Sequence, residues 1–167
     1  EILKSEDILI FHGQHEPGKT NDDVKSLCFS DCKMPQLPQN IGDIYKNIEI
    51  LIIWNSNLKS LTKFDLKQFE NLKRIQLYQT DIEFLPGDLF EYTKNIVDIV
   101  FSSNEIKFIG PKLLDGLDAL QRFYLGNNVN INFHYVSEDK NFPLEQLKER
   151  IRTDCKPPMD ENQMLNK

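Results

Sequence analysis

One apolar pattern recurs every 24 residues in this chain, and it limits the possible folds more than any other feature. In the turn that begins at Leu72, apolar and small polar positions follow the template LxxLxLxxNxLxxL. The template begins again, without insertions, at Val24, Ile48 and Ile96, and its first part begins at Leu120. A register that holds over about a hundred residues indicates a chain of stacked, similar turns.

The LxL segment of the template predicts a short strand, because side chains alternate between the two faces of a strand. In the turn from Leu72, Ile75 and Leu77 then point inward, and one strand alone cannot bury them, so each turn stacks on the next. The corresponding pairs are Leu27 and Phe29, Leu51 and Ile53, Ile99 and Phe101, and Phe123 and Leu125. We therefore predict an α/β solenoid with a parallel sheet on its concave face and an irregular convex side.

The ninth template position turns the chain out of the strand. Asn suits this position, because its amide can bond to buried backbone groups. Only Asn104 and Asn128 hold Asn there, whereas the earlier turns hold Cys32, Ser56 and Thr80. We therefore expect a weaker hydrogen-bond ladder in the early turns.

The segments on either side of the repeats differ from them in pattern. The run at 8–11 is strand-like, and Leu144, Leu147 and Ile151 recur at the spacing of an amphipathic helix, with Pro143 at its start. We predict an N-terminal cap (1–23), four full repeats and part of a fifth (24–128), a C-terminal cap with a helix (129–155) and a disordered tail (156–167).

The side chains between the inward pairs face outward on the concave sheet. Three of them, Ile50, Ile52 and Trp54, are large and apolar on a face that should meet water, which is typical of an interface. The candidate ligand-binding residues are Ile50, Ile52, Trp54, Arg74, Gln76, Tyr78, Asp98, Val100, Arg122 and Tyr124. A homodimer contact, or the plain preference of β-branched residues for strands, would also explain the pattern.

Other functional classes find little support in the residues. The net charge of −6 argues against a nucleic-acid partner, and the apolar runs are too short for a membrane span. His12, His15 and Glu16 faintly resemble a metal-ligand cluster, but zinc sites usually need three or four convergent ligands. The scattered histidines suggest no catalytic triad. We therefore expect no enzyme activity, metal or cofactor.

Two turns also resemble a known family in their second halves. One carries Leu85-Pro86 followed by Leu89-Phe90, and the run IKFIGPKLLDGL covers 106–117. These segments resemble animal, arthropod-like extracellular leucine-rich-repeat proteins of the 24-residue subclass. The resemblance implies a leucine-rich-repeat horseshoe and a secreted protein. It also implies recognition of a protein or surface ligand through the concave sheet, in extracellular or innate-immune recognition.

The cysteines leave two further functions open. Cys28, Cys32 and Cys155 are odd in number, so at least one is not paired within the chain. Secreted relatives often tie the C-terminal helix to the last turn by a disulfide, but 129–131 offers Cys155 no partner. Cys155 is then a free thiol or forms an intermolecular disulfide. The alternatives are an assembly protein linked through Cys155, or an intracellular repeat scaffold with reduced thiols.

Overall fold

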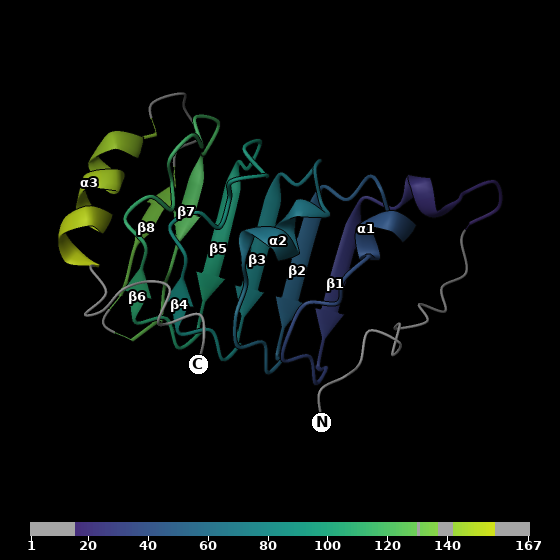
Figure 1. Cartoon of the computed structure of the whole chain (residues 1–167), viewed down its shortest axis with the longest axis horizontal. Helices are drawn as coiled ribbons and strands as arrows, with labels where there is room; N and C mark the ends of the chain where they lie inside the picture. Colours follow the sequence, from purple (N-terminus) through teal and green to yellow (C-terminus); the bar gives the residue numbers. More distant parts are fainter. Residues whose placement is uncertain (1–15, 130, 137–141, 156–167) are drawn as a thin grey trace.

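The structure is a computed structural model that describes residues 16–129, 131–136 and 142–155. Six strands lie side by side in one sheet, in the order of the chain (Figure 1). They are β1 (Ser26–Ser30), β2 (Ile50–Trp54), β3 (Arg74–Tyr78), β5 (Asp98–Ser102), β7 (Arg122–Tyr124) and β8 (His134–Val136). Strands β1 to β7 pair in parallel, which confirms the predicted solenoid sheet.

The register of the parallel strands repeats the spacing of the sequence. Leu27 pairs with Leu51, and Leu51 pairs with Ile75, so each partner lies one 24-residue turn further along the chain. All three side chains are buried in the core. A slip by one residue would turn every inward side chain outward, so the apolar repeat fixes the register.

Each turn leaves the sheet through a residue in the left-handed conformation. These residues have φ between 49° and 57°, and they occupy equivalent template positions. They are Asp31, Asn55, Gln79, Ser103 and Asn127. The backbone N–H of Asn55 donates to the carbonyl of Tyr78 at 3.0 Å, and the N–H groups of Asp31, Gln79 and Ser103 likewise donate to the next turn. The left-handed turns therefore stack at one edge of the sheet, just past the strand ends.

The ninth template position shows the gradient that the sequence predicts. The Oδ1 of Asn104 accepts from the backbone N–H of Thr80 at 2.9 Å and from its hydroxyl at 2.8 Å. The Nδ2 of Asn104 donates to the Leu77 carbonyl at 3.1 Å, and Asn128 bonds similarly one turn later. Ser56 accepts one longer bond, from a backbone N–H at 3.4 Å. Buried side-chain hydrogen bonds therefore join the later turns, and the equivalent hydrogen bonds in the early turns are weaker.

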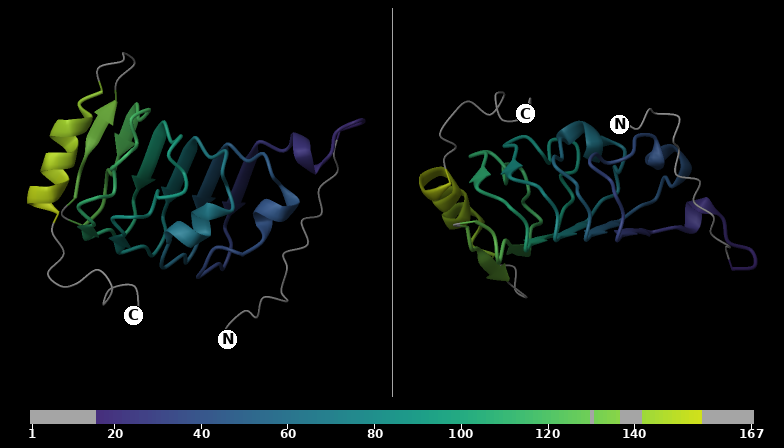
Figure 2. Two further views of the ribbon diagram at one scale, coloured as in Figure 1. Left: turned by 45° about the horizontal axis from the view of Figure 1, so that its top comes forward. Right: turned by 90° about the horizontal axis from the view of Figure 1, so that it is seen from below.

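Short elements lie across the core from the sheet (Figure 2). They are α1 (Ile41–Ile44), α2 (Lys63–Lys67) and the two-stranded parallel sheet of β4 (Phe84–Leu85) and β6 (Phe108–Ile109), and a 3-10 helix, η1 (Asn21–Asp23), precedes β1. The convex side is therefore partly regular. Large side chains such as Phe69 and Phe90 fill the space between the two sides, and this burial of apolar surface stabilises the stacked turns.

The C-terminal end of the solenoid is built differently from the repeats. Strand β8 runs antiparallel to β7, which the 24-residue pattern did not predict. Helix α3 (Leu144–Asp154) lies at this end and buries Ile151, in agreement with the predicted C-terminal helix (Figure 1). From α3, Arg150 donates to the Tyr135 hydroxyl at 2.6 Å and lies over the Phe133 ring, 4.9 Å from its centroid. A hydrogen bond and a cation–π contact therefore hold the helix to the segment around β8.

Three expectations fall outside the described residues. They concern the strand-like run at 8–11, the pair His12 and His15, and the tail at 156–167. Within the described ranges, no helix is long and apolar enough to cross a membrane.

Candidate ligand-binding surface

The ten candidate residues lie in three rows on the sheet face that points away from the core. The rows are Ile50–Arg74–Asp98–Arg122, Ile52–Gln76–Val100–Tyr124 and Trp54–Tyr78. Neighbouring strands lie about 4.8 Å apart, so neighbours in a row are within reach of each other. The structure thus brings all ten residues onto the concave face.

Strand β2 places three large apolar side chains on this face, here called the β2 patch: Ile50, Ile52 and Trp54. The two isoleucines are half-buried, whereas Trp54 is 52% exposed. The indole Nε1 of Trp54 donates to the Oε1 of Gln79 at 2.6 Å, which restrains the ring while leaving much of it open to solvent. A restrained, exposed tryptophan is the kind of residue that dominates many protein interfaces.

Strand β5 differs from the surface that the sequence predicts. Asp98 and Val100 are only 5% and 6% exposed, so they are not free to contact a ligand directly. The register explains this result, because Val100 lies between Gln76 and Tyr124, and Asp98 lies beside Arg122. The longer neighbouring side chains cover the shorter ones between them. Both residues were correctly placed on the concave face, but they form its floor.

Asp98 and Arg122 form an ion pair in the first row. The Nε of Arg122 donates to Oδ1 of Asp98 at 2.7 Å, and its NH2 group donates to Oδ2. The hydrogen bonds and the nearby carboxylate raise the pKa of Arg122 further above its ordinary value. Because both carboxylate oxygens of Asp98 accept from Arg122, the negative charge of Asp98 offsets the positive charge of Arg122 at this surface.

Tyr78 lies between the β2 patch and this ion pair. Partial burial raises the pKa of its phenol, and the negative charge of Asp98 adds to the effect, while the positive charge of Arg122 opposes it. The hydroxyl therefore stays protonated well above neutral pH, and it can donate a hydrogen bond to a ligand.

Tyr124 is held against the last turn, a contact that no sequence pattern predicts. A side chain at Gly126 would collide with the Tyr124 ring, so glycine lets the ring lie across the chain. The Tyr124 ring also meets His134 of β8 edge-on, with centroids 5.1 Å apart. His134 and Gln79 were not among the ten candidates. Gln79 follows from its template position, whereas His134 lies beyond the last repeat and has no such signal.

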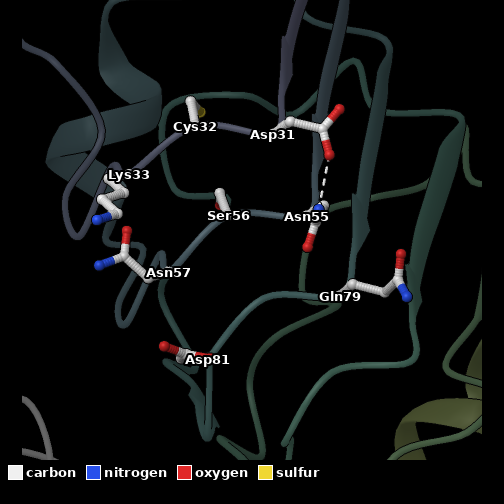
Figure 3. A pocket seen from close by; sticks show the side chains of 8 residues that line it. All are labelled: Asp31, Cys32, Lys33, Asn55, Ser56, Asn57, Gln79 and Asp81. Carbon is white, nitrogen blue, oxygen red and sulfur yellow. Dashed lines mark hydrogen bonds between the residues drawn. The ribbon is translucent and has the colours of Figure 1, made fainter.

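A shallow depression of about 360 Å³ lies beyond the ends of β1 to β3 (Figure 3). Its lining is polar and consists of Asp31, Cys32, Lys33, Asn55, Ser56, Asn57, Gln79 and Asp81. The Nδ2 of Asn55 donates to Oδ1 of Asp31 at 2.6 Å. This bond, and a second from the Ser30 hydroxyl, lower the pKa of Asp31. Internal bonds thus already occupy part of the lining. Nowhere in the described ranges do three or more His, Cys, Asp or Glu residues form a metal-binding group.

The three cysteines occupy different environments, and all are free thiols. Cys28 is exposed on the concave face, and Cys32 is half-buried just past the strand. Cys155 is buried among core residues, and this burial raises the pKa of its thiol to about 11. Burial disfavours the intermolecular disulfide proposed for Cys155, because another chain cannot reach the sulfur without an opening of the C-terminal cap.

Comparison with known proteins agrees with this architecture. The family described as leucine rich repeat matches residues 70–129, and with the stacked parallel sheet it shows that the chain folds as a leucine-rich-repeat solenoid. A chain in the structure of the Toll–Spatzle complex, described as a molecular hub in Drosophila development and innate immunity, superposes with a TM-score of 0.60 at 29% identity. The glycosylated form of that complex gives 0.59 at 28% identity.

Two curated proteins are also similar in sequence. Leucine-rich repeat-containing G-protein coupled receptor 5 of Rattus norvegicus is 26% identical over 110 residues, 66% of this chain. Volume-regulated anion channel subunit LRRC8A of Homo sapiens is 26% identical over 120 residues, 64% of this chain. The chain spans only 12% and 15% of these relatives, and 14% of each matched Toll–Spatzle chain. The similarity therefore concerns the repeats and not the whole proteins.

Proposed function

We propose that this chain is a recognition module that binds another protein through the concave face, with the β2 patch at the centre of the contact. Tyr78, Gln76, Arg74 and Tyr124 would add contacts around the patch, and the buried Asp98 and Val100 would support it from below. We further propose that the protein acts outside the cell, in extracellular or innate-immune recognition.

The observation that carries this proposal is the exposure of Trp54. Soluble proteins seldom leave a tryptophan and two neighbouring isoleucines together on one face without a partner. The bond to Gln79 also restrains the indole in advance, so less side-chain entropy is lost when a partner binds.

The similar proteins support the class of function and the location. One is named as a receptor, and another comes from a complex of Toll with Spatzle, described as a hub of innate immunity. Leucine-rich repeats serve many partners, so these names favour protein recognition without identifying the ligand.

The proposal is tested by replacing Trp54 with Ala and comparing what the purified protein captures from extracellular fluid of its source organism. Phe64→Ala is a matched control, because Phe64 is an aromatic residue of the convex side with 62% exposure. Quantitative mass spectrometry of the captured proteins gives the readout.

We expect Trp54→Ala to lose at least one partner about tenfold or more, and Phe64→Ala to keep it. Unfolding curves confirm that both variants remain folded. If both variants capture the same proteins as the unmodified chain, the β2 patch is not the binding surface.

A further inference from the structure

Arg74 is the one arginine of the first row without a partner among the described residues. It is exposed, and no hydrogen bond, ion pair or ring contact engages its guanidinium in the described ranges. Its neighbour Asp98 lies between Arg74 and Arg122 in the sheet, but both oxygens of Asp98 are taken by Arg122. Arg74 is thus left as an open, bidentate donor beside Ile50.

Basic residues lie beside Arg74 at the start of the strands. Glu49 is shared by two lysines, with 2.7 Å to the Nζ of Lys73 and 3.5 Å to that of Lys25. The first row and the positions one residue before each parallel strand hold six charged residues: Lys25, Glu49, Lys73, Arg74, Asp98 and Arg122. These positions hold four cations and two carboxylates, and acidic residues a few positions earlier, such as Asp22, Asp23 and Glu70, lie outside this count. The exposed guanidinium of Arg74, which has no partner among the described residues, therefore favours an acidic partner group at this position.

We infer that the partner presents an extended protein segment in which an Asp or Glu binds Arg74 and nearby apolar side chains cover the β2 patch. This inference rests on the proposed function, and it adds the chemistry of the partner. Ile50, Ile52 and Trp54 stand at alternate positions of one strand, about 7 Å apart. An extended segment repeats its side chains at the same interval, so its apolar groups match the patch while its carboxylate reaches Arg74.

The test is a phage-displayed library of random peptides, selected separately on the unmodified chain and on variants. Arg74→Glu reverses the charge at the inferred contact. Lys112→Glu makes the same charge change at an exposed position outside the sheet, and Trp54→Ala removes the largest group of the patch. Sequencing of the enriched peptides gives the preferred residues and their spacing. Binding of one enriched synthetic peptide is then measured at two salt concentrations.

We expect peptides with Asp or Glu at a fixed spacing from aromatic or aliphatic residues. Arg74→Glu should lose this acidic preference and favour Lys or Arg, and Lys112→Glu should keep it. Replacing the peptide's acidic residue by its amide should weaken binding about tenfold, and the effect should shrink at higher salt.

An apolar preference without an acidic one overturns the inference, and so does an acidic preference that survives Arg74→Glu. In either case, loss of enrichment in Trp54→Ala still supports the proposed function. If Trp54→Ala enriches the same peptides as the unmodified chain, the β2 patch is not the peptide site and the proposed function fails here. Enrichment of no peptide contradicts the extended-segment inference, and the capture experiment then decides the function alone.

Discussion

The two halves of the concave face share one backbone register but expose different surfaces. On β1 to β3, the β2 patch and Arg74 reach solvent, and Arg74 has no partner among the described residues. On β5 to β8, Asp98 and Val100 are buried and Arg122 is paired with Asp98. Tyr124 packs against His134. Equivalent positions of the repeat therefore differ in exposure and in pairing.

The difference arises from side chains and not from the backbone. The repeat decides where a side chain lies on the sheet, whereas the sizes and charges of its neighbours decide whether a ligand can reach it. Large residues flank small ones around β5, so the floor is covered and its charges are satisfied. On β2 the large residues themselves stand on the face, which leaves them available to a partner.

The largest effect should come from the interior ladder, which also differs between the two halves. Replacing Asn104 by Ala removes the partners of the Thr80 N–H and the Leu77 carbonyl, which are buried. Each unsatisfied group costs about 1–3 kcal/mol, so we expect a loss of about 2–4 kcal/mol in the free energy of unfolding. Urea denaturation gives the measurement.

Ser56→Ala is the matched change in the early turns. Ser56 makes one long bond, so we expect a loss below about 1 kcal/mol. Equal losses for the two variants would mean that the ladder is not stronger in the later turns.

A second prediction concerns the half of the concave face on β5 to β8, where Arg122 has a partner. Removing that partner would leave Arg122 unpaired, as Arg74 is on β3. Asp98→Asn keeps the shape of the side chain but removes the charge that pairs with Arg122. We expect a loss of about 1–3 kcal/mol in the free energy of unfolding, because the donors of Arg122 lose a buried acceptor. The same denaturation experiment measures this loss.

Arg74→Gln is the control for this change, since Arg74 has no described partner in the chain. Its effect should stay within about 0.5 kcal/mol, as for ordinary surface substitutions. A large loss in the free energy of unfolding for Arg74→Gln, or no loss for Asp98→Asn, would contradict the distinction between the paired Arg122 and the unpaired Arg74.

Much of the fold was predictable, because the same apolar template occurs in each 24-residue turn and each turn predicts the same strand. The inward pairs such as Ile75 and Leu77 and the outward rows follow directly from the 24-residue register. The gradient of the ladder followed from residue type at Ser56 and Asn104. The helix α3 followed from its own apolar period. The predicted boundaries of the caps and the roles of the ten surface residues stay predictions.

What the sequence could not provide depends on contacts between turns. The burial of Val100 depends on Gln76 and Tyr124, which stand one turn away on each side. The pairing of Asp98 with Arg122 instead of Arg74 depends on side-chain geometry, since both arginines are its neighbours in register. Strand β8 lies beyond the last repeat, so the repeat pattern did not predict its antiparallel pairing.

A small effect on stability should come from the residue with the largest proposed effect on binding. Trp54→Ala removes a side chain that is half open to solvent and one exposed hydrogen bond to Gln79. We expect a loss of about 1 kcal/mol in the free energy of unfolding, since about half of the ring stays in water in the folded chain. A loss of several kcal/mol would mean that Trp54 serves the fold, and its exposure would then no longer argue for a partner.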